Sequence, residues 1–271
     1  PRILRAIQEL GLTPDDVRYI LLTHVHLDHA GGAGLLASHC NQAQVVVHPR
    51  GVRHLVNPSK LWKAVCEVYT QDVAERDYGG MVPIDPLRII EATETLSLRL
   101  GSRQINFWDA PGHALHHVFI LDEGSNAIFT GDTFGISYRE LDSPQGAFTF
   151  VTSSPSQFDP QTHKASVMRV MQAKPKAVYL THYSELRQVQ AAGEALLQQI
   201  DSYAALASRH GHRGQGRAQA IAADLEDLLF DELKAHGSLL SQKELKTLLA
   251  LDLRLNADGL ICWLDRIQAG R

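Results

Sequence analysis

The sequence contains few cysteines and no long apolar run. Its three cysteines, Cys40, Cys66 and Cys262, are widely spaced and form no Cys-x-x-Cys pair, so a disulfide framework is not indicated. We interpret them as free thiols in a reducing compartment and expect a cytoplasmic location. No apolar stretch approaches the roughly 20 residues of a membrane span, and no signal peptide is visible. A membrane partner is therefore not expected.

An excess of positive charge is also missing. The chain has 26 Lys and Arg residues against 30 Asp and Glu residues, a formal net charge of -4. This balance gives no electrostatic footprint for nucleic acid or for an anionic membrane. With 44% hydrophobic and 21% charged residues in 271 positions, the composition is that of an ordinary globular protein able to bury a large core. We expect its partner to be a small-molecule substrate.

What the sequence does have is a cluster of metal-binding side chains directly after an apolar run. Tyr19-Ile20-Leu21-Leu22 predicts a strand, and Thr23-His24-Val25-His26-Leu27-Asp28-His29 follows it. Alternate side chains of an extended segment share a face, so His24 and His26 can point at one spot, and a turn brings Asp28 and His29 beside them. Imidazole and carboxylate ligands suit zinc, iron or manganese. The complete pattern behind a strand therefore indicates a metal site.

Three further apolar runs also lead to a candidate ligand. Residues 105–108 precede His113, residues 127–130 precede Asp132, and residues 177–181 precede His182. Sites in α/β folds gather at the carboxyl ends of strands, which is where these side chains would lie. The full set of five His and two Asp residues suits two ions rather than one.

The remaining pattern predicts a mixed α/β chain. Helices are predicted over residues 3–10, 30–39, 163–173, 186–203, 221–233 and 260–267, with a further helix after a capping box at 241–244, and strands over 19–22, 44–48, 118–121, 127–130 and 177–181. Alternating apolar residues over 88–107 predict antiparallel strands, and residues 134–162 are expected to form a long loop. Residues 1–210 are predicted to be one domain, followed by a linker over 210–216. Residues 217–271 are predicted to be a helical appendage that packs or forms a homodimer.

With these residues in place, the chain resembles the metallo-β-lactamase-fold superfamily, whose signature is Thr-His-x-His-x-Asp-His followed by further His, Asp and His ligands. The resemblance covers residues 1 to about 210 and implies an αββα four-layer sandwich. It also implies the assignment of ligands. His24, His26 and His113 would bind one metal, Asp28, His29 and His182 the other, and Asp132 both. The implied cofactors are two divalent ions, zinc foremost, with iron or manganese as alternatives.

The chain departs from that family in two places. Family members have several strands before the His cluster, whereas only 22 residues precede Thr23, so we expect a truncated sequence that lacks the first strands. The segment around His113 has the sequence Ala-Pro-Gly-His-Ala-Leu-His-His instead of Thr-Pro-Gly-His-Thr-x-Gly-His. His117 matches the last His of that pattern and is expected to contact a ligand or to pack nearby. His116 replaces a glycine and is expected to be structural.

The resemblance implies a hydrolase in which a hydroxide held between two metal ions attacks an ester, thioester or lactone carbonyl. Asp28 is the candidate catalytic residue, because it could shuttle a proton to the leaving group. Tyr138 and Tyr183 lie near ligands in the sequence and are candidates for contact with the substrate oxyanion, with ordinary packing as the alternative. The motifs at 23–32 and 129–134 are similar to those of glyoxalase II, although the basic positions that bind glutathione in that family are not found.

Two other functions stay open. The same fold supports di-iron oxygen- or nitric-oxide-reducing proteins and mononuclear-iron persulfide dioxygenases. Flavodiiron proteins carry Glu where this chain has His26, which favours hydrolysis, although sites built from His can also take iron. The third hypothesis is a non-catalytic scaffold stabilised by metal, and the intact ligand set argues against it.

Overall fold

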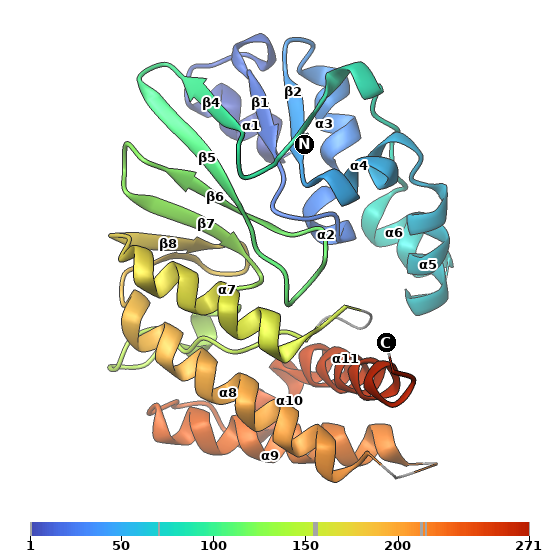
Figure 1. The fold of residues 1–271 in the computed structure, drawn as a ribbon, viewed down its shortest axis with the longest axis vertical. Helices are drawn as coiled ribbons and strands as arrows, with labels where there is room; N and C mark the ends of the chain where they lie inside the picture. Colours follow the sequence, from blue (N-terminus) through green and yellow to red (C-terminus); the bar gives the residue numbers. More distant parts are fainter. Residues whose placement is uncertain (1, 70, 154–156, 212–213, 215, 271) are drawn as a thin grey trace. The chain divides into compact units, whose positions relative to one another are not determined.

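The structure is a computed structural model that describes residues 2–69, 71–153, 157–211, 214 and 216–270. It divides into two compact units. The first comprises Pro1–Asp109 and His116–Gly124, and the second comprises Ala110–Leu115 and Ser125–Arg271. Both units mix helices and strands, so the α/β class predicted from the sequence is confirmed (Figure 1). The predicted linker over 210–216 includes residues 212, 213 and 215, which lie outside the described residues.

Six strands belong to the described part of the first unit. They are β1 (Tyr19–Leu21), β2 (Gln44–Val47), β3 (Ile89–Glu91), β4 (Ser97–Leu100), β5 (Arg103–Asp109) and β6 (Val118–Asp122). β1, β2 and β3 form a parallel sheet in that order, and β4, β5 and β6 pair antiparallel. The prediction of antiparallel strands over 88–107 is correct for β4 and β5 but wrong for β3, which pairs parallel with β2. Residues 93–96 turn the chain out of the parallel sheet before β4 begins.

Helices and short 3-10 turns connect these strands. They are α1 (Arg2–Glu9), η1 (Pro14–Asp16), α2 (Leu27–Ala30), α3 (Ala33–His39), α4 (Pro49–Val56), α5 (Ser59–Tyr69), α6 (Gln71–Tyr78) and η2 (Pro86–Arg88). Thr13 precedes η1, and its N–H and its hydroxyl both donate to the Asp16 carboxylate, at 2.8 and 2.7 Å. The first unit thus carries the strand and the short helix needed to present the His cluster.

Alternating side chains of β2 separate two apolar layers in the first unit. Val45 and Val47 pack with helix residues such as Ala33 and Leu55, whereas Val46 packs with Phe107 and other residues of the antiparallel strands. All three valines are fully buried. Successive strand residues point to opposite faces, so a helix layer covers one face of the parallel sheet and the second set of strands covers the other.

The second unit combines three strands with long helices. Its elements are β7 (Ala127–Gly131), η3 (Arg139–Leu141), α7 (Pro160–Ala173), β8 (Ala177–Leu180), β9 (Ser184–Leu186), α8 (Val189–Arg209), α9 (Arg217–Ala235), α10 (Gln242–Leu248) and α11 (Ala250–Gln268). β8 pairs parallel with β7 and antiparallel with β9. Helix α8 packs against α7, α9 and α11 (Figure 1). The domain boundary predicted between 210 and 217 stays a prediction.

Two assignments in the second unit differ from the sequence pattern. Helix α7 begins at Pro160 and not at His163, because the Asp159 side chain accepts from the Thr162 N–H and caps the helix. Leu186 belongs to β9 and not to the following helix, which begins at Val189. Both differences concern the site. His163 lies in the first turn of α7, and His182 lies in the turn between β8 and β9.

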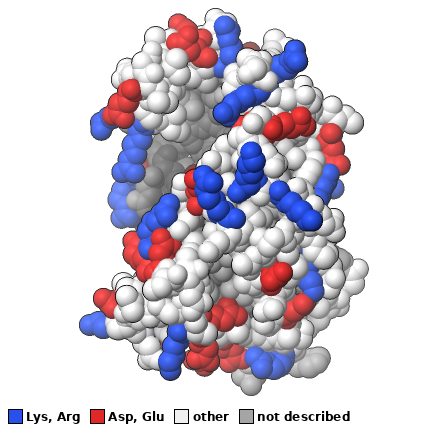
Figure 2. Space-filling view, turned by 90° about the vertical axis from the view of Figure 1, so that its left-hand side faces the viewer, with Lys and Arg blue, Asp and Glu red and all other residues white. Residues whose placement is uncertain are grey.

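Two general expectations can be compared with the described residues. The cysteines Cys40, Cys66 and Cys262 are free, as expected. Among the helices that the structure describes, none is long and apolar enough to cross a membrane. Figure 2 shows basic and acidic side chains distributed together over one face of the molecule. The cytoplasmic location and the homodimer through the C-terminal helices stay predictions.

Candidate metal centre

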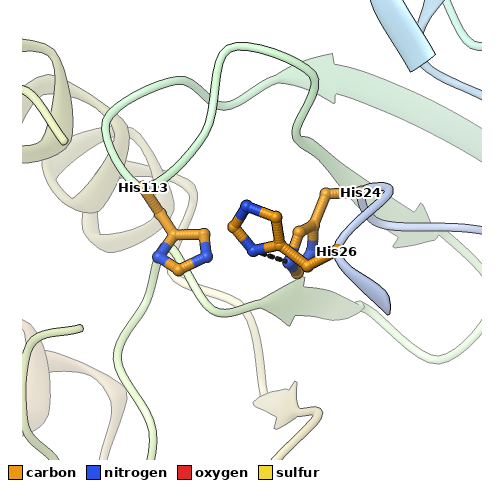
Figure 3. Close-up of side chains that lie close together, drawn as sticks. All are labelled: His24, His26 and His113. Atoms are coloured by element: carbon orange, nitrogen blue, oxygen red, sulfur yellow. Dashed lines mark hydrogen bonds between the residues drawn. The ribbon is translucent and has the colours of Figure 1, made fainter. Parts of the chain in front are cut away.

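The first part of the site follows directly from β1. The Thr23 carbonyl, two residues after this strand, accepts from the Val118 N–H at 2.7 Å, which ties the segment to β6. His24 is fully buried and His26 is half-buried. Nε2 of His24 lies 3.0 Å from Nδ1 of His26, the contact dashed in Figure 3. The two imidazoles therefore point at one spot, as the His-x-His spacing predicts.

Helix α2 carries the next two candidate ligands, Asp28 and His29. Oδ2 of Asp28 lies 3.3 Å from Nε2 of His29, and the His29 ring centroid lies 3.9 Å from that of His24. The His29 side chain is only 4% exposed, whereas 46% of the Asp28 side chain faces solvent. Gly31 makes this turn achievable, because a Cβ at that position would lie 2.5 Å from the Leu27 carbonyl oxygen.

Two further histidines, His116 and His117, contact this cluster. His117 is fully buried, and its ring stacks on that of His24 with a centroid distance of 4.9 Å. Nδ1 of His116 accepts from the Val25 N–H at 3.4 Å, so that side chain holds the backbone between the two ligands. The structure thus places His117 against a candidate ligand and His116 against the backbone between His24 and His26, and the roles expected for both stay predictions.

In the second unit, a close approach of two backbones positions His113. Gly112 has φ +126°, and a Cβ there would lie 2.3 Å from Cα of His163 in α7. The Gly112 carbonyl accepts from the Asp159 N–H at 2.9 Å, and the Ser166 hydroxyl donates to the Pro111 carbonyl at 2.7 Å. The first turns of α7 therefore hold the loop that carries His113. Figure 3 shows the His113 side chain extending from that loop.

Asp132 follows β7 and lies between two imidazoles of the second unit. Its Oδ2 is 3.7 Å from Nε2 of His113 and 3.8 Å from Nε2 of His182. Both distances exceed the range of a direct N–H···O hydrogen bond. The carboxylate and His113 are buried, while a third of the His182 side chain is exposed. Two atoms that bind the same metal ion are likewise close to each other without a direct hydrogen bond. The positions of Oδ2 and the two ring nitrogens therefore suit ligands of metal ions.

His163 links the loops that carry Asp132 and His113, and it is not among the residues that the sequence pattern predicts for the site. Its Nε2–H donates to the Thr133 carbonyl at 2.7 Å, and the Thr133 hydroxyl donates to the Ala110 carbonyl at 3.1 Å. Burial, together with the nearby His113, lowers the pKa of His163 to about 4. Its side chain is thus neutral at physiological pH. The Asp-Pro cap indicates the helix start, but it gives no sign that His163 is buried.

The two tyrosines expected near the substrate have other partners in the second unit. The Tyr138 hydroxyl donates to the Asp252 carboxylate of α11 at 3.0 Å. The Tyr183 hydroxyl donates to Asp142 at 2.9 Å, and the Arg139 guanidinium lies 3.9 Å from the Tyr183 ring centroid. Burial raises the pKa of the Tyr183 phenol, and so does its bond to Asp142. Both hydroxyls are engaged by protein carboxylates, which favours the packing alternative, and contact with an oxyanion stays a prediction.

Each part of the site separately fits a metal ion. Two nitrogens bound to a tetrahedral zinc at about 2.0–2.1 Å lie about 3.3 Å from each other, close to the 3.0 Å between the ring nitrogens of His24 and His26. The Nδ1–H of His113 donates to the Thr152 carbonyl at 3.1 Å, which leaves Nε2 as the nitrogen for a metal. All seven expected ligands are among the described residues that could hold a metal ion: His24, His26, Asp28, His29, His113, Asp132 and His182.

Comparison with known proteins agrees with these observations. A metallo-beta-lactamase fold-containing protein of Sulfurisphaera tokodaii is 28% identical over 176 residues, which are 62% of this chain and 61% of that protein. The hydroxyacylglutathione hydrolase of Rhodopseudomonas palustris is 28% identical over 131 residues, which are 48% of this chain and 38% of that enzyme. The chain therefore spans less than two thirds of the length of either curated relative.

Solved structures and a family model complete the comparison. An archaeal metallo-beta-lactamase superfamily protein from Sulfolobus tokodaii has a TM-score of 0.57 at 27% identity and covers 67% of each chain. A metallo-beta-lactamase family protein from Thermus thermophilus shares the fold with a TM-score of 0.64 at 19% identity, over 99% of this chain and 80% of that one. The family model described as the metallo-beta-lactamase superfamily matches residues 1–182. The chain therefore belongs to the metallo-beta-lactamase superfamily and has its mixed α/β fold, followed by a C-terminal helical part.

Proposed function

We propose that the chain is a metal-dependent hydrolase with a binuclear centre. The observation that supports this most is the position of Asp132, whose Oδ2 lies 3.7 Å and 3.8 Å from the ring nitrogens of His113 and His182. A carboxylate in this position can serve two ions at once. In the proposed centre, His24, His26 and His113 would hold one ion, Asp28, His29 and His182 would hold the other, and Asp132 would serve both.

Two divalent ions supply Lewis-acid polarisation of a carbonyl oxygen and a water acidified towards neutral pH. The protein supplies orientation and a route for the proton. Asp28 is the most exposed of the carboxylates in the set, at 46% for its side chain, and it lies beside His29. It is therefore placed to accept a proton and to donate it to a leaving group. The imidazoles of His24 and His113 are each buried, so solvent does not compete for their ring nitrogens.

An ester, thioester or lactone is the proposed substrate class. Its support is the similarity to the hydroxyacylglutathione hydrolase of Rhodopseudomonas palustris, which extends over 131 residues. The net charge of -4 does not favour a nucleic acid substrate. Zinc is the proposed metal, because neutral imidazoles with carboxylates suit it, and these ligands also accept iron or manganese.

Metal content and turnover together test the proposal. Protein purified without added metal should contain two zinc ions per chain and hydrolyse simple esters, thioesters or lactones. Asp28→Ala should lower kcat by about 10²–10⁴-fold, the usual contribution of a positioned proton donor. Asp231→Ala, which removes an exposed carboxylate on α9, is the matched control and should leave kcat unchanged.

Other results would contradict the proposal in different ways. Two iron ions with a visible absorption band would replace the zinc hydrolase by a redox protein on the same fold. Bound metal without turnover of any of the three substrate types would favour a metal-stabilised scaffold. Full activity in Asp28→Ala would show that Asp28 takes no part in the catalytic step.

A further inference from the structure

Two helices of the second unit hold one backbone segment through buried side-chain amides. From α8, Oε1 of Gln199 accepts from the Val151 N–H at 2.9 Å, and its Nε2 donates to the Thr149 carbonyl at 3.2 Å. From α11, Oδ1 of Asn256 accepts from the Ser153 N–H at 2.7 Å, and its Nδ2 donates to the Val151 carbonyl at 3.1 Å. Gln199 is 2% and Asn256 1% exposed. We refer to these four hydrogen bonds as the amide clamp on residues 149–153.

The opposite edge of the same segment faces the site. Phe150 exchanges both backbone hydrogen bonds with Ile136, at 2.9 and 3.0 Å, on the side away from the amide clamp. The next carbonyl on that side is that of Thr152, which accepts from Nδ1 of His113 at 3.1 Å. Backbone groups alternate between the two edges of an extended segment, so fixing Val151 and Ser153 on one edge fixes the Thr152 carbonyl on the other.

This carbonyl controls the orientation of a candidate metal ligand. A carbonyl that accepts from one ring nitrogen of a ligating imidazole selects its tautomer and the direction of its other nitrogen. If residues 149–153 shifted by one position, the carbonyl facing His113 would be lost, because neighbouring carbonyls point the opposite way. The amide clamp, together with the pairing of Phe150 with Ile136, therefore sets the register of the segment and with it the direction of Nε2 of His113.

We propose that Asn256 is a positioning residue for the metal centre, acting through residues 151–153 and the Thr152 carbonyl on His113. This inference rests on the proposed function, because it assumes that His113 binds metal. It assigns a role in the site to the C-terminal helices, for which the sequence predicted only packing or dimerisation. Packing of α11 itself comes from other side chains, including the buried Leu253, Leu260 and Leu264, so the two roles can be separated.

The test compares Asn256→Ala with Leu260→Ala, a control that removes a buried side chain of α11 outside the amide clamp. Zinc dissociation constants are measured by competition with a chelator, and the visible spectrum of the Co²⁺-loaded protein reports ligand geometry. Asn256→Ala should weaken zinc binding about tenfold, the lower end of the range for residues that orient ligands, and should change the Co²⁺ spectrum. Leu260→Ala should lower the melting temperature without changing either metal readout.

A double-mutant cycle shows whether Asn256 acts through His113. In a His113→Ala background, adding Asn256→Ala should leave the remaining zinc affinity unchanged within about twofold. An equal loss with and without His113 would overturn the inference, and so would wild-type zinc binding by Asn256→Ala. If Asn256→Ala does not fold, Asn256→Asp keeps the size of the side chain and replaces the amide donor to Val151 by a carboxyl oxygen, and unchanged metal readouts in that variant would overturn the inference. Failure of the unaltered protein to take up zinc would instead contradict the proposed function.

Discussion

Single residues that bind no metal control much of the geometry of this site. His163 is the clearest case, since it is fully buried beneath the His113 loop and its Nε2–H donates to the carbonyl that follows Asp132. Burial keeps this imidazole neutral, because transfer of a charged ring into the interior is unfavourable. The same burial makes the stability of the fold sensitive to acid.

The pH dependence of stability should report the titration of His163. The unfolded chain takes up this proton near pH 6.5, whereas the folded chain does so only near pH 4. Between these values the unfolded state binds more protons, so the free energy of unfolding falls as the pH falls. His163→Gln retains an N–H donor for Thr133 and should flatten this dependence by about 3 kcal/mol across the window. Urea unfolding of both metal-free proteins at several pH values measures it, and parallel curves would contradict it.

The candidate ligands and the residues that support them differ in how far the sequence reveals them. The cluster from His24 to His29 could be predicted because each ligand follows an apolar strand within a few residues. Thr152 and Asn256 could not, since their roles depend on contacts between distant segments. Ser153 and Asn256, for example, are 103 positions apart. Thr152 contributes only its backbone carbonyl, for which no side-chain type is diagnostic.

At the scale of elements, the start of α7 is the feature that most affects the site. Asp159 caps this helix, and its own N–H donates to the carbonyl of Gly112. Sequence periodicity identified the helix but began it at His163, because the Asp-Pro boundary lies in a stretch rich in Ser and Pro. The pairing of β3 was missed for a related reason. An alternating pattern identifies a strand but not the neighbour with which it pairs.

Two cap substitutions should separate stability from metal binding. Asp159→Ala and Ser241→Ala each remove a side-chain cap, one from α7 and one from α10. Each should cost about 1 kcal/mol of unfolding free energy. Only Asp159→Ala should also weaken zinc binding, because α7 holds the His113 loop. Urea unfolding and chelator competition measure the two effects, and equal zinc affinities in the two variants would contradict the link between α7 and the site.

At the scale of the whole molecule, the proposed ions should contribute to stability. A ligand that binds only the folded state at 100 times its dissociation constant stabilises it by about 2.7 kcal/mol. Removal of zinc by a chelator should therefore lower the melting temperature, and added zinc should restore it. Asp132→Ala removes the carboxylate proposed to contact both ions, and it should abolish most of the zinc-dependent shift. Asp231→Ala should retain the zinc-dependent shift. A melting temperature that the chelator does not change would contradict the binuclear proposal.

The family and the candidate ligand set can be predicted from local motifs, whereas the division into two compact units cannot. Apolar periodicity shows that a segment is buried, but not which other segments bury it. The four helices α8 to α11 illustrate this limit. Their amphipathic patterns were visible, yet the buried amides of Gln199 and Asn256 look like ordinary polar positions in the sequence. Their importance comes from the backbone segment against which they pack.

The amide clamp also has a consequence for the order in which the protein matures on the ribosome. Asn256 is synthesised 103 residues after Ser153, which at about 5–20 residues per second takes roughly 5–20 s. Throughout this interval His113 and Asp132 have already been synthesised, but the segment that orients His113 lacks at least the Asn256 half of its amide clamp. Under our proposal, a nascent chain would capture zinc weakly until Asn256 has been made and α11 has packed against residues 151–153. Tight metal loading would then follow the synthesis of α11.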